Sequence, residues 1–138
     1  MSYESFYKSV CEQYSDSKII SIFGCPGNKA QNRRVDLPKI ASKYSDHIII
    51  CEEDSGKEPF ENIAKDIESN IEIENYDVIE DRDKSLHHAL FDLADNNTVI
   101  VFLGKGEETY LKRGDEYQPC ETDLSIAQKY IKQYDNLN

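Results

Sequence analysis

A loop rich in glycine and cations follows the first strand-like apolar run of the chain. It reads GCPGNKAQNRR over residues 24–34. A glycine there lets the backbone approach a ligand closely, and a cluster of cations can bind a small anion such as a phosphate. The same cations could instead be solvated side chains that offset nearby acids. The residues of this loop that could face such an anion are Gly27, Asn28, Lys29, Arg33 and Arg34.

Three further loops carry glycine or paired charges. The segment CEEDSGKEP covers residues 51–59, EDR covers residues 80–82, and GKGEE covers residues 104–108. The glycines of the last segment allow close approach of the backbone to a ligand. The EDR segment suits a local ion-paired turn that caps the following helix, which needs no ligand.

The elements that must position these loops alternate along the chain. Strand-length apolar runs cover residues 19–23, 47–51, 76–79 and 98–103, and they are nearly continuous, as in strands buried on both faces. Segments with helical apolar spacing separate them, a helix with an aromatic stripe precedes them, and a hairpin turning at residues 113–115 and a last helix follow. The fold class is therefore α/β, with a Rossmann-like, doubly wound, mostly parallel sheet flanked by helices and a C-terminal β-hairpin.

In such sheets, ligands bind outside the carboxyl ends of the strands. That rule selects the four loops described above, because each follows one of the predicted strands. We expect their side chains to lie together at one edge of the sheet.

Composition narrows the function classes. The 138 residues suit one domain, and a net charge of -11 argues against binding to nucleic acid or to an anionic membrane. No apolar run reaches the length of a membrane span, and the start lacks the pattern of a signal peptide, so a cytoplasmic location is expected. The four cysteines are widely spaced, which favours reduced thiols and no metal site.

Three motifs together resemble the C-terminal domain of the Mur ligases, and most closely that of UDP-N-acetylmuramoyl-tripeptide synthetases. FGCPGNKAQNRR resembles the family's FGCGGDRDKGKR loop, VIEDRDKSLHHAL its EDR-plus-helix segment, and VIVFLGKGEETY its strand ending in GKGHE. The order and spacing agree over nearly the whole chain. The resemblance implies that residues 1–138 form the amino-acid-binding, closing domain of an ATP-dependent amide ligase, and that the upstream ATP-binding and UDP-substrate domains are absent.

The resemblance also implies a reaction and its partners. In the family, ATP phosphorylates a carboxylate of the UDP-linked muramoyl dipeptide, and the amine of an incoming amino acid attacks the acyl phosphate. ATP and Mg²⁺ would be bound mainly outside this chain, which has no GxxxxGK[ST] phosphate loop, so the isolated chain is expected to be inactive. No catalytic residue is assigned with certainty. The resemblance implies that the amino acid is bound by Glu108, Gly104, Asp54, Gly56 and Lys57. It also implies that the nucleotide is faced by Gly27, Asn28, Lys29, Arg33 and Arg34.

Departures from the family pattern keep alternatives open. Asn28 stands where aspartate is usual, Glu107 where histidine is usual, and Gly56 where the DNPR motif has an arginine that is expected to hold the second carboxylate of diaminopimelate. With acids at residues 52–54, the loop favours a substrate ammonium group and hence L-lysine. The alternatives are a stand-alone noncatalytic binding module and the C-terminal domain of another Mur or folylpolyglutamate ligase.

Overall fold

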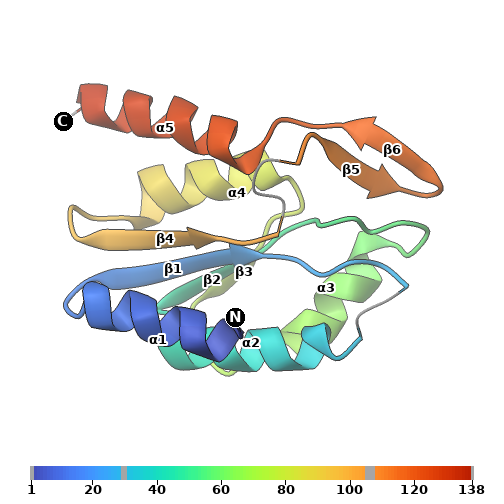
Figure 1. Cartoon of the computed structure of the whole chain (residues 1–138), viewed down its shortest axis with the longest axis horizontal. Coiled ribbons are helices and arrows are strands. Elements are labelled where there is room, and N and C mark those ends of the chain that lie inside the picture. Colours follow the sequence, from blue (N-terminus) through green and yellow to red (C-terminus); the bar gives the residue numbers. More distant parts are fainter. Residues whose placement is uncertain (1, 29–30, 105–107, 138) are drawn as a thin grey trace.

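The computed structural model describes residues 2–28, 31–104 and 108–137. Four parallel strands form one sheet between two layers of helices, and an antiparallel hairpin lies beyond one end of it (Figure 1). The strands of the sheet are β1 (Lys18–Phe23), β2 (His47–Ile50), β3 (Tyr76–Val78) and β4 (Thr98–Phe102), and those of the hairpin are β5 (Tyr110–Arg113) and β6 (Glu116–Pro119). The helices are α1 (Tyr3–Gln13), α2 (Arg33–Tyr44), α3 (Phe60–Glu68), α4 (Arg82–His88), the π-helical segment η1 (Ala89–Leu93) and α5 (Asp123–Leu137). The predicted α/β class, parallel sheet and hairpin are confirmed.

The strand order explains where a ligand site can form. The order across the sheet is β3-β2-β1-β4, so the chain moves outward from β1 through β2 to β3 and then returns to the other side of β1. A reversal of this kind opens a crevice at the carboxyl ends of the two strands that flank it. Here these strands are β1 and β4, and they lead directly into the glycine loop at Gly24 and into Gly104.

The core consists of two apolar layers, one on each face of the sheet. Helices α1, α2 and α3 cover one face, and α4, η1 and α5 cover the other (Figure 1). Alternate residues of β1 supply the two layers: Ile19 and Phe23 belong to the first, and Ile20 and Ile22 to the second. This is why the apolar run of β1 is continuous rather than alternating.

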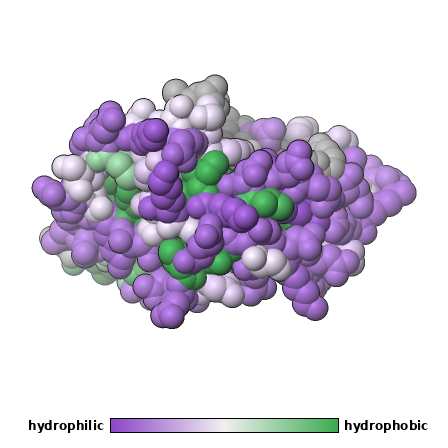
Figure 2. Space-filling model, turned by 90° about the horizontal axis from the view of Figure 1, so that it is seen from below, coloured by the Kyte–Doolittle hydropathy of each residue, from purple (hydrophilic) through white to green (hydrophobic). Residues whose placement is uncertain are grey.

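The outer surface reflects the charge of the chain. Figure 2 shows the molecule from below the view of Figure 1, and hydrophilic residues cover most of that face, with hydrophobic ones in small separate groups. Among the described residues, no helix combines the length and the apolar character that crossing a membrane requires.

Candidate functional site

The glycine loop after β1 lies directly on the loop after β2. A Cβ added at Gly24 would overlap the carbonyl of Cys51, and one added at Gly27 would overlap the carbonyl of Ser55. The amide of Gly27 donates to the carbonyl of Asp54 at 2.9 Å. These glycines are therefore needed for contact between two protein loops, in addition to any approach of a ligand.

Arg34 holds the glycine loop from inside the protein. Its side chain is only 2% exposed, and its guanidinium donates to both carboxylate oxygens of Glu58, to Asp66 at 2.7 Å and to the carbonyl of Pro26 at 3.1 Å. Glu58 in turn accepts from the amide of Asn28 at 3.0 Å. The hydrogen bond from Arg34, followed by the one from the Asn28 amide, lowers the pKa of Glu58 to about 2.

Arg33 forms the neighbouring pair and remains partly exposed. Its Nη1 lies 3.1 Å from a carboxylate oxygen of Glu53, with side-chain exposures of 21% and 6%. Gly104 lies against the same carboxylate, because a Cβ at that position would come within 2.7 Å of Glu53 Oε1. Lys29 and residues 105–107 lie outside the described residues.

Arg82 joins the ends of three segments in the interior. It donates to the carbonyls of Glu52 and Leu103, at 3.0 and 3.1 Å, and forms a two-point pair with Asp123 at the start of α5, at 3.1 and 2.6 Å. Its guanidinium also stacks 4.7 Å from the ring centroid of Phe102. Arg82 and Asp123 are 8% and 6% exposed, so the pair is desolvated.

This arrangement corrects part of the sequence prediction for the EDR segment. Asp81 does cap α4, since its side chain accepts from the amide of Lys84 at 2.9 Å. Arg82, however, makes no local ion-paired turn and instead crosses to Asp123, 41 residues later. Sequence reasoning missed Asp123, and its place at the start of the last helix was the available signal.

The hairpin packs against the loop after β2. The amide of Gly56 donates to the carbonyl of Lys112 at 3.2 Å, and the amide of Gly114 donates back to the carbonyl of Gly56 at 2.6 Å. The amide of Lys112 donates to the carboxylate of Asp54 at 2.8 Å. A segment more than fifty residues away therefore fixes two of the expected amino-acid-binding residues.

Arg113 of the hairpin pairs with Glu52, and sequence reasoning assigned it no role. The guanidinium donates to both carboxylate oxygens of Glu52, at 2.9 and 2.7 Å, and to the side chain of Gln118 at 2.9 Å. The hydrogen bond to Glu52 raises the pKa of Arg113 above its ordinary value. Glu52 is 6% exposed, whereas Arg113 is 51% exposed.

Two other expected amino-acid-binding residues lie at the hairpin. Glu108 is exposed and lies two residues before β5, where its carbonyl accepts from the thiol of Cys120 at 3.9 Å. Lys57 pairs with Asp115 at 3.1 Å, and both side chains are largely exposed. No described contact places Glu108 beside Lys57.

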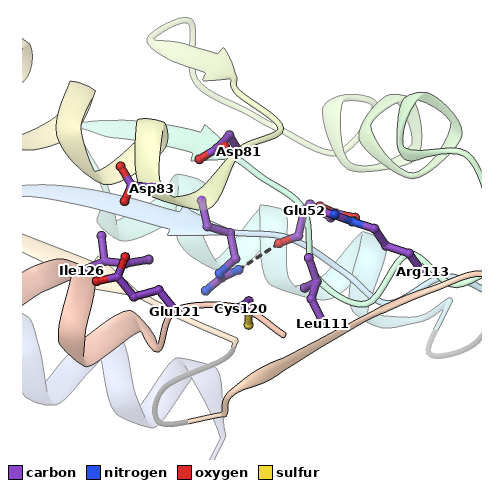
Figure 3. A pocket seen from close by; sticks show the side chains of 9 residues that line it. Glu52, Asp81, Asp83, Leu111, Arg113, Cys120, Glu121 and Ile126 are labelled. Carbon is purple, nitrogen blue, oxygen red and sulfur yellow. Dashed lines mark hydrogen bonds and ion pairs between the residues drawn. The ribbon is translucent and has the colours of Figure 1, made fainter. Parts of the chain in front are cut away.

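Two hollows flank the loop after β2. One lies between the glycine loop, this loop and the hairpin, and it is lined by Gly27, Asn28, Asp54, Gly56, Lys57, Lys112, Gly114 and Asp115. The other lies between the loop after β2, the start of α4, the hairpin and the start of α5. It is lined by Glu52, Asp81, Arg82, Asp83, Leu111, Arg113, Cys120, Glu121 and Ile126. Figure 3 shows the second hollow, with Glu52 and Arg113 side by side across it from Asp83 and Ile126.

The first hollow collects predicted residues from two separate loops. Gly27 and Asn28 were expected to face a nucleotide, whereas Asp54, Gly56 and Lys57 were expected to contact the amino acid. Asn28, Asp54 and Gly56 have φ values of 57°, 41° and 63°, in the left-handed region. Such a φ costs energy at Asn28 and Asp54, which carry side chains, and strain of this kind concentrates at functional sites, so this hollow is the candidate site.

The groups that line the candidate site are suited to binding a small polar molecule. Within residues 2–28, 31–104 and 108–137, no cluster of histidine, cysteine and carboxylate side chains could hold a metal ion. Burial raises the pKa of the Cys25 and Cys51 thiols to about 12, so neither is a thiolate nucleophile at neutral pH. Amide, carboxylate and ammonium groups line the hollow, and these suit a zwitterion or another small polar molecule.

Comparison with known proteins identifies relatives of this chain. The family model described as "Mur ligase, glutamate ligase domain" matches residues 2–106. A UDP-N-acetylmuramoyl-L-alanyl-D-glutamate–2,6-diaminopimelate ligase of Clostridium acetobutylicum is 35% identical over 121 residues, which are 88% of this chain and 25% of the relative. A UDP-N-acetylmuramyl-tripeptide synthetase of Ligilactobacillus salivarius is 29% identical over 133 residues, which are 96% of this chain and 26% of the relative.

A solved structure supports the fold. The structure of a UDP-N-acetylmuramoyl-L-alanyl-D-glutamate–2,6-diaminopimelate ligase superposes with a TM-score of 0.81 over 95% of this chain and 27% of that chain, at 19% identity. The chain thus spans about a quarter of the length of the relatives it matches.

Proposed function

From the premise that this chain belongs to the family of Mur ligase glutamate ligase domains, we propose that it is the C-terminal domain of an ATP-dependent UDP-N-acetylmuramoyl-tripeptide synthetase. The domain would deliver the third amino acid of the peptidoglycan precursor to an acyl phosphate formed on the UDP-linked muramoyl dipeptide. The observation that carries the proposal is the assembly of the glycine loop, the loop after β2 and Gly104 at one edge of the sheet. Relatives of both the diaminopimelate-adding and tripeptide-synthetase types support the same reaction class.

ATP and Mg²⁺ would be held mainly by upstream domains of the complete ligase. The cations of the glycine loop divide between two roles in this proposal. Arg34 is buried and positions the loop through Glu58, whereas Arg33 is partly exposed and could face the nucleotide with Lys29. Cations at a closing interface stabilise phosphate charge once water is excluded. The isolated chain is expected to catalyse no ligation, because the groups that cradle a triphosphate would come from elsewhere.

The amino acid would bind in the hollow between the glycine loop, the loop after β2 and the hairpin, and Gly104, which does not line that hollow, is proposed to contact the substrate from the neighbouring loop. Glu108 is proposed to hold the α-ammonium group by a charge-assisted hydrogen bond. Asp54 and Lys57 are proposed to contact the remainder of the substrate, and Gly56 to leave room for it.

We propose that this amino acid is L-lysine, although fewer acidic side chains support the choice than the sequence alone suggested. Glu52 and Glu53 are paired with Arg113 and Arg33, so they add little negative charge to the candidate site. The argument now rests on the carboxylate of Asp54 and on Gly56, which replaces the fork-shaped cation of the family motif, while Lys57 and Lys112 are the ammonium groups that line the same hollow. The relatives include diaminopimelate ligases as well as tripeptide synthetases, so they favour neither substrate.

The test is a ligation assay of the complete ligase at equal concentrations of L-lysine and meso-diaminopimelate. A kcat/KM that favours lysine is expected, and a preference for diaminopimelate would refute the assignment. If the complete protein binds nucleotide but ligates neither amino acid, the result would favour the noncatalytic binding module. The departures from the family motif at Asn28 and Gly56 support that alternative.

A further inference from the structure

Several hydrogen bonds and one ion pair join the hairpin to the loop after β2. The two backbone bonds that join Gly56 to Lys112 and Gly114, and the bond from the Lys112 amide to Asp54, all cross between these segments. The Arg113–Glu52 pair adds a charged contact at the near end of the same loop. Residues 52–56 are therefore held from both ends by one side of the hairpin.

The loop needs such support because its backbone is strained. Asp54 has a left-handed φ value, which costs energy at a residue with a side chain, whereas Gly56 adopts the same region without that cost. A strained loop keeps its shape only when the surrounding structure holds it. The carboxylate of Asp54 takes its direction from the Lys112 amide, which belongs to the hairpin.

The Arg113–Glu52 pair is suited to fix the hairpin in place. It is a two-point contact between planar groups, which sets orientation as well as distance. Glu52 is 6% exposed, so its carboxylate needs a partner in that position. It also accepts from the hydroxyl of Ser55 at 3.2 Å, which extends the contact into the strained segment.

We propose that the β5–β6 hairpin is a positioning element of the amino-acid pocket, and that Arg113 acts as its latch by pairing with Glu52. The inference rests on the proposed function for its kinetic consequence, but its structural part stands on this chain alone. Arg113 is a positioning residue, because its Nε and Nη2 donate to Glu52 and its Nη1 donates to Gln118. Through the latch, the hairpin sets where Asp54 and Gly56 lie and hence how tightly the incoming amino acid binds.

The structural part can be tested by hydrogen exchange of this chain. Arg113→Gln should speed exchange of the Gly56 and Gly114 amides by on the order of tenfold or more, since a charge-assisted contact that closes the segment is lost. Lys43→Gln is the matched control, because it removes one cation from the exposed Lys43–Glu4 pair at a distance from the hairpin. It should leave both amides unchanged.

The kinetic part uses the complete ligase. Arg113→Gln should raise the KM for the amino acid by about tenfold while the KM for ATP and kcat at saturation change little. Arg113→Lys keeps the charge but loses the two-point geometry, so its KM should lie between those of the parent and of Arg113→Gln. The double variant with Glu52→Gln should lose no more than about the larger single loss, as expected for two partners of one contact.

The outcomes separate the latch from the proposed function. Unchanged exchange of the two amides in Arg113→Gln overturns the latch, whatever the enzyme does. Faster exchange with an unchanged KM for the amino acid overturns the positioning role in the pocket. A parent ligase that uses no amino acid refutes the proposed function, while the exchange result still decides whether Arg113 holds the loop.

Discussion

Replacing Arg82 should be among the most damaging single changes in this domain. Arg82→Met keeps most of the side-chain length but removes the pair with Asp123 and the bonds to the carbonyls of Glu52 and Leu103. Breaking a buried pair by removing one partner costs about 3–5 kcal/mol, and we expect a loss in that range. The total free energy of unfolding of such a domain is only about 5–15 kcal/mol. The loss should therefore lower the midpoint of thermal unfolding by roughly 10–20 °C.

The assay is urea unfolding of this chain, followed by far-ultraviolet circular dichroism. Lys129→Met is the matched control, because Lys129 pairs with Asp83 and so joins the same two helices, α4 and α5, through exposed side chains. The control should change the free energy of unfolding far less. Arg82→Met combined with Asp123→Asn should be less destabilised than the sum of the two single losses, since they share one interaction. A loss below about 1 kcal/mol in Arg82→Met would refute the claim that this pair holds the loops together.

Three further predictions concern the loops at the site. The lowered pKa of Glu58 means that its contribution to stability is present above its ordinary value near 4.5 and is lost as the pH falls toward about 2; Glu58→Gln should flatten that part of the stability–pH curve measured by urea unfolding. Gly27→Ala should destabilise the chain by about 1–3 kcal/mol in the same assay, because the new Cβ would overlap the Ser55 carbonyl, and a change under about 0.5 kcal/mol would contradict the contact. In the complete ligase, Glu108→Gln should raise the KM for the amino acid about tenfold or more, and unchanged kinetics would assign Glu108 to solvent.

The fold could be predicted well from the sequence, because the apolar composition of the strands indicates that they are buried. The apolar run of β1, interrupted only by Ser21, and that of β2 indicate strands buried on both faces, and this requires helices on both sides of a parallel sheet. The carboxyl-edge rule then located the loops that form the candidate site. The cap at Asp81 was likewise visible from the local sequence, since capping depends on residues three apart.

The long-range pairs could not be predicted in the same way. Nothing local distinguishes Glu52 from Asp54, yet one is held by Arg113 and the other by a backbone amide of the same hairpin. Arg34 looked like an exposed cation because its neighbours are polar, but its partners Glu58 and Asp66 lie 24 and 32 residues away. Such pairings depend on how the loops approach each other, and that is set by the sheet.

The four arginines of the chain explain why an acidic protein concentrates cations beside its candidate site. Each pairs with a carboxylate from another segment: Arg33 with Glu53, Arg34 with Glu58 and Asp66, Arg82 with Asp123, and Arg113 with Glu52. The pairs made by Arg33 and Arg34 join the glycine loop to the loop after β2 and to the short segment that follows it. The pair made by Arg113 joins the hairpin to the loop after β2. An acid-rich loop left alone would repel itself and could not keep a strained backbone, whereas two-point arginine contacts neutralise its carboxylates and fix their direction. The carboxylate of Asp54 takes its direction from the Lys112 amide and that of Glu52 from Arg113, so one hairpin orients two acidic side chains of this loop.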